Sequence, residues 1–166
     1  CQSAPDVRGE FLDLSGALDQ ETGVLVRAPW LGTEPVPLDL FTHAVVPAHP
    51  AAIALGLLMQ RLQQAAPVRF AAATVLEPAS EFGRAAMDEL HQQTVSLLSF
   101  QSLPRAIYDA QAAYNLLGGL GEAATVNLSG ADAQIRRHYE ALGSGRWPAL
   151  ALQVIHAPVF HGHTFS

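Results

Sequence analysis

The chain has 166 residues, enough for one domain with a substantial core. Apolar residues make up 49% and charged residues only 14%, a balance typical of a folded protein rather than a disordered one. The formal net charge is −6, and all nine basic residues are arginines. This acidic balance, without a cluster of basic residues, argues against nucleic acids and anionic membranes as partners.

The cysteine count and the apolar runs indicate the cellular setting of the chain and whether it could cross a membrane. Cys1 is the single cysteine, which excludes a disulfide within the chain and favours a cytoplasmic setting. The longest apolar run is interrupted by Pro47 and Pro50, and the apolar segment after Pro50 is too short to cross a bilayer. No signal-peptide pattern opens the chain, and it begins without methionine. We therefore expect a fragment of a longer protein.

The first part of the chain predicts two short strands and a helix. Residues 10–14 and 24–28 have the strand pattern. The stretch 29–39 contains three prolines and is the best candidate for a domain boundary. Residues 51–65 predict an apolar helix opened by Pro50, whose missing N–H is no loss in a first helical turn.

A buried strand and a second helix are expected next. Residues 68–76 are apolar and rich in small and β-branched side chains, which predicts a buried strand. Ser80 is expected to cap a helix that runs to about Leu98. Its inward stripe recurs every four residues, at Phe82, Ala86, Leu90, Thr94 and Leu98.

The last third predicts one more helix and an extended segment. Ser129 and Asp132 resemble a capping box, so a helix is expected to open there and to end near Gly143. Residues 150–160 have the pattern of one long extended segment. Helices and strands therefore alternate, and the fold class is mixed α and β.

Five segments, in order, carry a resemblance to a known family. They are residues 11–18 (FLDLSGAL), 45–50 (VVPAHP), 81–90 (EFGRAAMDEL), 110–117 (AQAAYNLL) and 155–164 (IHAPVFHGHT). Together they resemble the aspartate-semialdehyde dehydrogenase family, from the last part of its nucleotide-binding domain to near the end of its catalytic and dimerisation domain. The resemblance covers essentially the whole chain.

The resemblance implies a fold and a division into domains. The fold is α+β, of the glyceraldehyde-phosphate-dehydrogenase-like type, in which helices pack on a mixed sheet. The end of a Rossmann-type nucleotide domain precedes it. On this interpretation residues 1–43 are the remnant of the nucleotide-binding domain, and residues 44–166 are the catalytic-like and dimerisation domain.

The family's reaction indicates which residues to look for. A cysteine thiolate attacks the aldehyde, hydride passes to NADP, and phosphate releases the acyl group. A helix N-terminus lowers the pKa of the thiol, and a histidine moves protons. An arginine holds the substrate carboxylate with two hydrogen bonds, because its planar fork matches two oxygens. A glutamine positions the reacting carbonyl, and further basic residues bind phosphate.

The resemblance places other residues at most of these positions. Pro50 stands at the nucleophile and has no nucleophilic atom. Glu77 stands at the glutamine, and His156 at the substrate arginine. Asp19 reverses the charge at a phosphate-binding arginine, and only the acid/base histidine is retained, as His163. The chain is thus similar to the Usg-type branch, homologues that keep the fold without the catalytic cysteine.

Two other interpretations of the sequence are weaker. His49, His156, His161 and His163 could offer metal ligands, but no thiol or fixed ligand spacing accompanies them, so the sequence predicts no metal site. On a strand, His161 and His163 would share a face, whereas His156 has the opposite parity unless a bulge intervenes. The glycines of 118–121 follow an apolar helical stretch and are expected to form a cap and turn rather than a phosphate loop.

The resemblance implies a catalytically silent relative that works by association, as a homodimer or with an active paralogous dehydrogenase. The alternative is an active NADP-dependent oxidoreductase of amino-acid biosynthesis, with His163 and Glu77 in an altered site. No cofactor is expected within this chain, and NADP would bind to the missing N-terminal domain. We expect Pro50, Glu77, His156 and His163 to converge on one cleft, where Asp19 and Glu77 disfavour anions.

Overall fold

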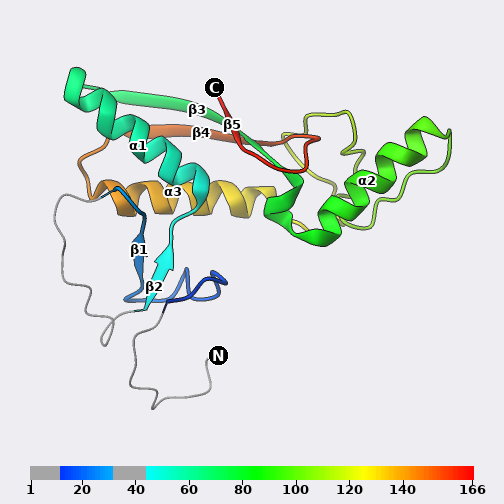
Figure 1. Cartoon of the computed structure of the whole chain (residues 1–166), viewed down its shortest axis with the longest axis horizontal. Helices are drawn as coiled ribbons and strands as arrows, with labels where there is room; N and C mark the ends of the chain where they lie inside the picture. The colour runs from blue at the N-terminus through cyan, green and yellow to red at the C-terminus, as the bar shows by residue number, and fades with distance from the viewer. Residues whose placement is uncertain (1–11, 32–43) are drawn as a thin grey trace, which may run out of the picture. The chain divides into compact units, whose positions relative to one another are not determined.

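The structure is a computed structural model that describes residues 12–31 and 44–166 (Figure 1). Its contacts divide the chain into two units, each described by itself. The described parts of the first unit are residues 12–31, 44–68 and 137–148, and those of the second are 69–136 and 149–166. Residues 10, 11 and 32–43 lie outside the described ranges, so the domain boundary placed after residue 43 stays a prediction.

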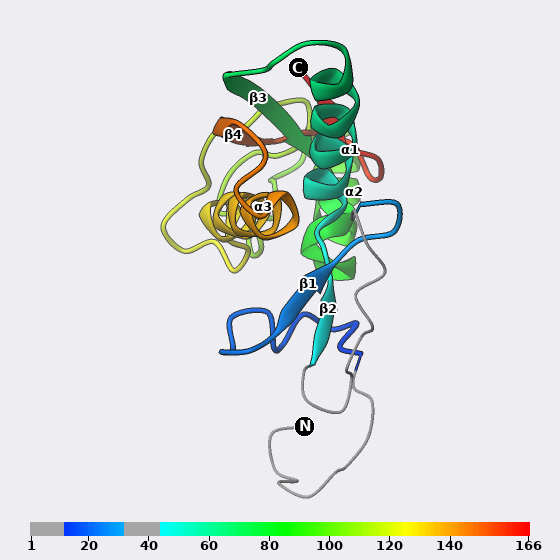
Figure 2. The same ribbon diagram turned by 90° about the vertical axis from the view of Figure 1, so that its left-hand side faces the viewer.

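In the first unit, β1 (Leu25–Arg27) and β2 (Val45–Pro47) form a two-stranded parallel sheet (Figure 2). Leu25 lies opposite Val45, and Leu12 makes a further parallel bridge to Val45. The strand expected at 24–28 is therefore confirmed, in a slightly shorter form. Of the strand expected at 10–14, the described part contributes only this bridge.

The helix α1 (Pro50–Ala65) confirms the expected apolar helix and its start. Pro50 occupies the first helical turn, and the ring nitrogen Nδ1 of the capping residue His49 accepts the backbone N–H of Ala51 at 3.2 Å. A Cβ on Gly56 would lie 2.4 Å from the ring of Trp147. The indole therefore packs against the helix backbone itself, an approach that only glycine permits.

The second unit is built on a mixed three-stranded sheet. β3 (Phe70–Glu77) pairs in parallel with β4 (Ala149–His156) over eight residues, from Phe70 opposite Ala149 to Glu77 opposite His156 (Figure 1). The short β5 (Thr164–Phe165) pairs antiparallel with the other edge of β3. The α+β class with a mixed sheet is confirmed, although the extended segment expected to reach residue 160 ends as a strand at His156.

The helix after β3 begins later than expected. A 3-10 turn, η1 (Ala79–Phe82), comes first, and α2 (Arg84–Leu98) comes next. Gly83 separates them with φ of +85°, a conformation that favours glycine and interrupts the helical path. Ser80 lies within the 3-10 turn, so its expected role as the cap of α2 is wrong.

Two buried side chains of α2 hold the long segment between α2 and α3. The carboxylate of Glu89 accepts the backbone N–H groups of Ile107 and Tyr108 at 2.8 and 3.1 Å. The amide oxygen of Gln93 accepts those of Ala112 and Ala113 at 2.8 and 3.1 Å. These N–H groups point to side chains rather than to helical carbonyls, so the helical stretch expected before Gly118 is wrong.

These contacts close the core of the second unit. The Gln93 amide also donates to the carbonyls of Pro104 and Ala110. The buried cluster that results consists of Ala79, Ala86, Leu90, Tyr108, Ala112 and Ala113. Tyr108 and Leu90 are among the largest side chains that are fully buried. The segment after α2 is thus irregular in backbone and still well packed.

The last helix, α3 (Leu128–Gly143), ends at the glycine that was expected. The side chain of Asn127 accepts the backbone N–H of Gly130 at 2.9 Å, so Asn127 provides the cap that was assigned to Ser129. Asp132 pairs forward with Arg136 one turn on instead of reaching back. Among the described residues, none of the helices is both long and apolar enough to span a membrane.

Candidate functional site

Glu77 and His156 lie side by side at the carboxyl ends of two parallel strands. They are register partners, and both side chains are fully buried. Partners in a parallel ladder point to the same face of the sheet. The carboxyl ends of parallel strands are a common place for ligand sites. The second unit therefore brings together two residues that the resemblance places in the site.

His163 joins them from the loop before β5. Its Nε2 lies 3.1 Å from Oε2 of Glu77 and 3.8 Å from Oε1 of Glu81. The hydrogen bond with Glu77 and the two nearby carboxylates raise the pKa of His163, and burial opposes them. Glu77, which the resemblance places at the family's glutamine, is thus the direct partner of His163, which it places at the acid/base histidine.

The loop that carries His163 is tied to the turn after β3. The N–H of Ala79 donates to the carbonyl of Val159 at 2.9 Å, and that of Ser80 donates to Phe160 at 3.0 Å. Residues 157–163 are not a strand, so the expectation that His161 and His163 share a strand face is wrong. The loop, and not strand parity, brings His163 to Glu77.

His156 lies in an aromatic environment. Its ring stacks on Tyr108 with centroids 4.7 Å apart and is tilted against Phe82 at 5.7 Å. Burial lowers the pKa of His156, and Glu77 opposes this effect. A neutral imidazole offers at most one N–H, so it cannot form the two-oxygen clamp of an arginine.

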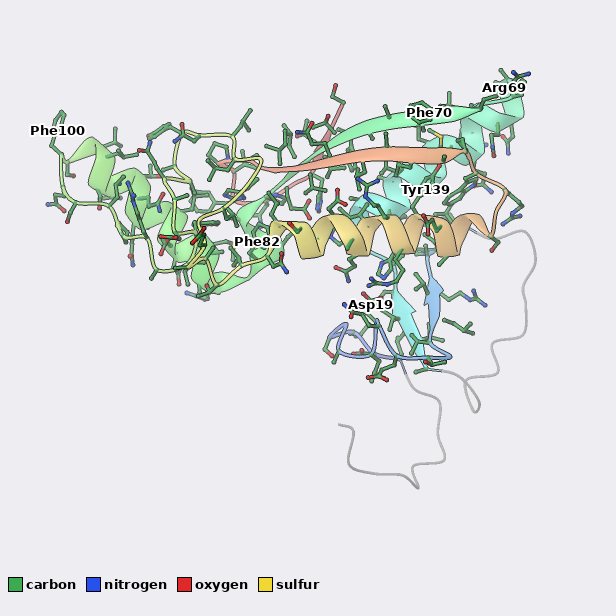
Figure 3. The ribbon with its side chains drawn as sticks, turned by 180° about the vertical axis from the view of Figure 1, so that it is seen from behind. Asp19, Arg69, Phe70, Phe82, Phe100 and Tyr139 are labelled. Carbon is green, nitrogen blue, oxygen red and sulfur yellow. The ribbon has the colours of Figure 1, made fainter. Side chains whose placement is uncertain are left out.

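Asp19 lies in the first unit (Figure 3), where a cation balances its negative charge. Its carboxylate contacts Nε2 of His138 at 2.5 Å and forms an ion pair with Arg137. Burial works against the charge of Asp19, but the hydrogen bond from His138 and the charge of Arg137 prevail, and its pKa is lowered. The expected repulsion of anions by Asp19 therefore needs correction, because Arg137 balances its charge.

His138 connects Asp19 to the start of α1. Its Nδ1 accepts the backbone N–H of His49 at 2.8 Å, so the proton of a neutral ring lies on Nε2, toward Asp19. Burial lowers the pKa of His138 and favours this neutral form. Pro50 comes directly after His49, at the helix N-terminus where the resemblance places the nucleophile.

Sequence reasoning missed Glu81, Tyr108 and His138. Glu81 follows Glu77 by four residues, in the turn directly after the strand that Glu77 ends, and two carboxylates this close in the sequence could have been noticed. Nothing in the local sequence connects Tyr108 with His156 or His138 with Asp19. These pairs depend on distant segments that meet only in the folded chain.

Two curated relatives match nearly the whole chain. A USG-1 protein homolog of Pseudomonas aeruginosa is 31% identical over 159 residues, which is 93% of this chain and 46% of that protein. A USG-1 protein homolog of Azotobacter vinelandii is 29% identical over 160 residues, with 94% and 46% covered. The chain fits the Usg-type group of the aspartate-semialdehyde dehydrogenase family. It spans about half the length of these relatives.

Solved structures support the fold and the likeness to aspartate-semialdehyde dehydrogenases. A probable aspartate-semialdehyde dehydrogenase from Pseudomonas aeruginosa aligns with a TM-score of 0.79 at 27% identity, over 93% of this chain and 46% of that one. Aspartate semialdehyde dehydrogenase II from Vibrio cholerae aligns with a TM-score of 0.76 at 16% identity, over the same shares. The second likeness concerns the fold alone. No protein-family profile matches the chain.

Proposed function

We propose that this Usg-type chain belongs to a protein that keeps the dehydrogenase fold without the thiolate reaction and works by association, as a homodimer. The start of α1 carries the proposal. Pro50 is the first residue of the helix, at the place where a thiolate would profit from the helix dipole. Proline offers no nucleophile, and no cysteine lies among the described residues.

The neighbouring replacements support the same interpretation. The buried carboxylate of Glu77 disfavours an anionic substrate where a neutral amide would position a carbonyl. His156 is buried between aromatic rings and lacks the arginine fork. Arg137 is the cation beside Asp19, and its ion pair with that carboxylate reduces its ability to hold phosphate. Restoring one group alone would leave the other groups wrong for the reaction.

NADP is the cofactor of the family reaction, and within the described residues no strand leads through a glycine-rich turn into a helix. The turn from β2 into α1 contains no glycine, and the glycines of 118–121 lie in an irregular segment before α3. We therefore expect no dinucleotide to bind these residues through that motif. NADP binding by the longer protein would use other segments.

An active oxidoreductase with altered chemistry is the second candidate, and one observation favours it. Glu77 and His163 form a carboxylate–imidazole pair at 3.1 Å, an arrangement suited to proton transfer. This candidate predicts NADPH formation that disappears in His163→Asn. The leading proposal predicts no NADPH formation with aspartate semialdehyde, NADP and phosphate in either protein, so one spectrophotometric assay separates them.

The proposed homodimer is tested by measuring the molecular mass of the protein in solution. Analytical ultracentrifugation of the full-length protein should give twice the polypeptide mass at micromolar concentration. A single-chain mass under these conditions would contradict the homodimer. A shift to a mixed species on addition of an active paralogous dehydrogenase would point to that partner instead.

A further inference from the structure

Three side chains with metal-ligand chemistry meet in the second unit. They are Glu77, Glu81 and His163, and each offers one oxygen or nitrogen atom within 4.8 Å of the others. Nε2 of His163 is 3.1 Å from Oε2 of Glu77 and 3.8 Å from Oε1 of Glu81. Two ligand atoms that are each about 2.1 Å from one ion lie at most about 4.2 Å apart. The two separations from His163, 3.1 and 3.8 Å, lie within this limit.

The scaffold holds these groups in place without an ion. Glu77 ends β3, and Glu81 lies four residues on, in η1. The loop before His163 is fixed by the Ala79–Val159 and Ser80–Phe160 hydrogen bonds. Each ligand therefore comes from a backbone segment that is tied to the same sheet edge. Such preorganisation reduces the ordering that ion binding requires.

Burial and charge favour a dication at this point. The side chain of Glu77 is 0% exposed, that of His163 12% and that of Glu81 28%. Two carboxylates held this close repel each other. A divalent ion balances both carboxylates and accepts the neutral imidazole as a third ligand.

His156 is a second, independent observation. It is the register partner of Glu77 and is fully buried. Neither of its ring nitrogens makes a hydrogen bond to the part of the chain that the structure describes. A buried imidazole without a hydrogen-bond partner among the described residues, next to Glu77, points to a polar ligand or an ion at this edge of the sheet.

We infer that the second unit binds a divalent transition-metal ion through Glu77, Glu81 and His163. Two carboxylates and one imidazole suit Zn²⁺ or Mn²⁺, whereas Mg²⁺ prefers oxygen ligands alone. Three protein ligands leave coordination positions for water. The inference departs from the expectation of no metal site, which considered the histidines and overlooked the two carboxylates.

Calorimetric titration of the chelator-treated full-length protein with zinc chloride near pH 7 tests the site. We expect one Zn²⁺ per chain, and binding at least about tenfold weaker in Glu77→Gln and in His163→Ala. His161→Ala and Glu122→Gln remove the same kinds of group at exposed positions and should bind as the wild type does. Absence of a one-to-one site, or unchanged affinity in His163→Ala, would overturn the inference.

A measurement on the wild type covers the case in which a variant does not fold. Mn²⁺ broadens the NMR signals of nearby amides, so those of Glu81, Phe82 and His163 should be lost first. Phe82 lies before the start of α2 and Phe100 after its end (Figure 3). The helix between them has 15 residues and is therefore roughly 22 Å long. The Phe100 signal should therefore persist. Earlier loss of Phe100 than of His163 would refute the site.

Discussion

The ring of His138 lies 2.5 Å from the carboxylate of Asp19, and the two side chains are only 0% and 6% exposed. The opposite ring nitrogen accepts the N–H of His49, which caps α1. A charge reversal that sequence comparison assigns to a lost phosphate site thus has a structural task. It fixes the histidine that anchors the first turn of the helix.

Asp19→Asn should destabilise the first unit. The change removes the ion pair with Arg137 and a hydrogen bond between a charged carboxylate and His138, at a side chain that is only 6% exposed. We expect a loss of roughly 1–3 kcal/mol in the free energy of unfolding, measured by urea denaturation. As a control, Asp88→Asn breaks an exposed ion pair with Arg84 and should change the free energy of unfolding by at most about 0.5 kcal/mol. Equal effects of the two variants would contradict this account.

Stability should fall in mild acid because of His138. Burial lowers the pKa of His138 in the folded state; the nearby Arg137 and His49 lower it further, and Asp19 opposes them. The unfolded chain keeps the ordinary pKa of 6.5. As the pH falls through 6.5, the unfolded state takes up a proton that the folded state resists, so the free energy of unfolding decreases. The contribution of Asp19, whose pKa is lowered from 3.8, is lost only in stronger acid.

The comparison of wild type with His138→Asn isolates this effect, since asparagine does not titrate. Urea denaturation at about pH 7.5, 6.5 and 5.5 should show a steeper loss of stability in the wild type than in the variant. Parallel curves would mean that His138 does not distinguish the two states. The six other histidines are common to both proteins and cancel in the difference.

Gln93 is expected to be the most sensitive polar residue of α2. Gln93→Leu leaves the buried N–H groups of Ala112 and Ala113 without their acceptor, so we expect a loss of roughly 2–4 kcal/mol in the free energy of unfolding. Gln92→Leu, at the exposed neighbouring position, should change it by about 0.5 kcal/mol or less. Similar losses in both variants would show that the hydrogen bonds of Gln93 do not hold the segment.

The sequence predicted those elements whose cause is local. Apolar composition and Pro50 were enough for α1, and a run of apolar, small and β-branched residues was enough to predict β3. The expectation that this strand is buried is wrong for most of its length, since only Val75 and Glu77 are buried in it. The start of α2 was misplaced because the left-handed Gly83 separates a 3-10 turn from the helix. The segment after α2 was misread because its N–H groups bond to Glu89 and Gln93, partners that no local pattern reveals.

The residues of the candidate site likewise include some that could be predicted from the sequence and some that could not. The resemblance supplied Glu77, His156 and His163, and the second unit does bring these three together. It did not supply Glu81, because the family comparison considers only catalytic positions. Nor did it show that Asp19 is compensated, because its partner Arg137 is distant in the sequence. The roles of the site residues in chemistry stay predictions.

Pro50→Cys should restore a thiol without restoring the reaction. In a Cys1→Ser background, the new thiol at the N-terminus of α1 should react with iodoacetamide, because the helix dipole favours the thiolate. Glu77 and His156 would still be wrong for the substrate, so no dehydrogenase activity is expected. Strong activity from this single change would mean that the other positions have been misassigned.

The central claim, loss of the thiolate reaction, is tested most directly by NADPH formation. The full-length protein, after a chelator wash, is incubated with aspartate semialdehyde, NADP and phosphate, and absorbance is followed beside an active dehydrogenase as control. We predict no NADPH above the rate without protein, because the resemblance places Pro50, which has no nucleophilic atom, at the nucleophile position. Turnover within about tenfold of the usual enzyme median of roughly 10 per second would contradict the account.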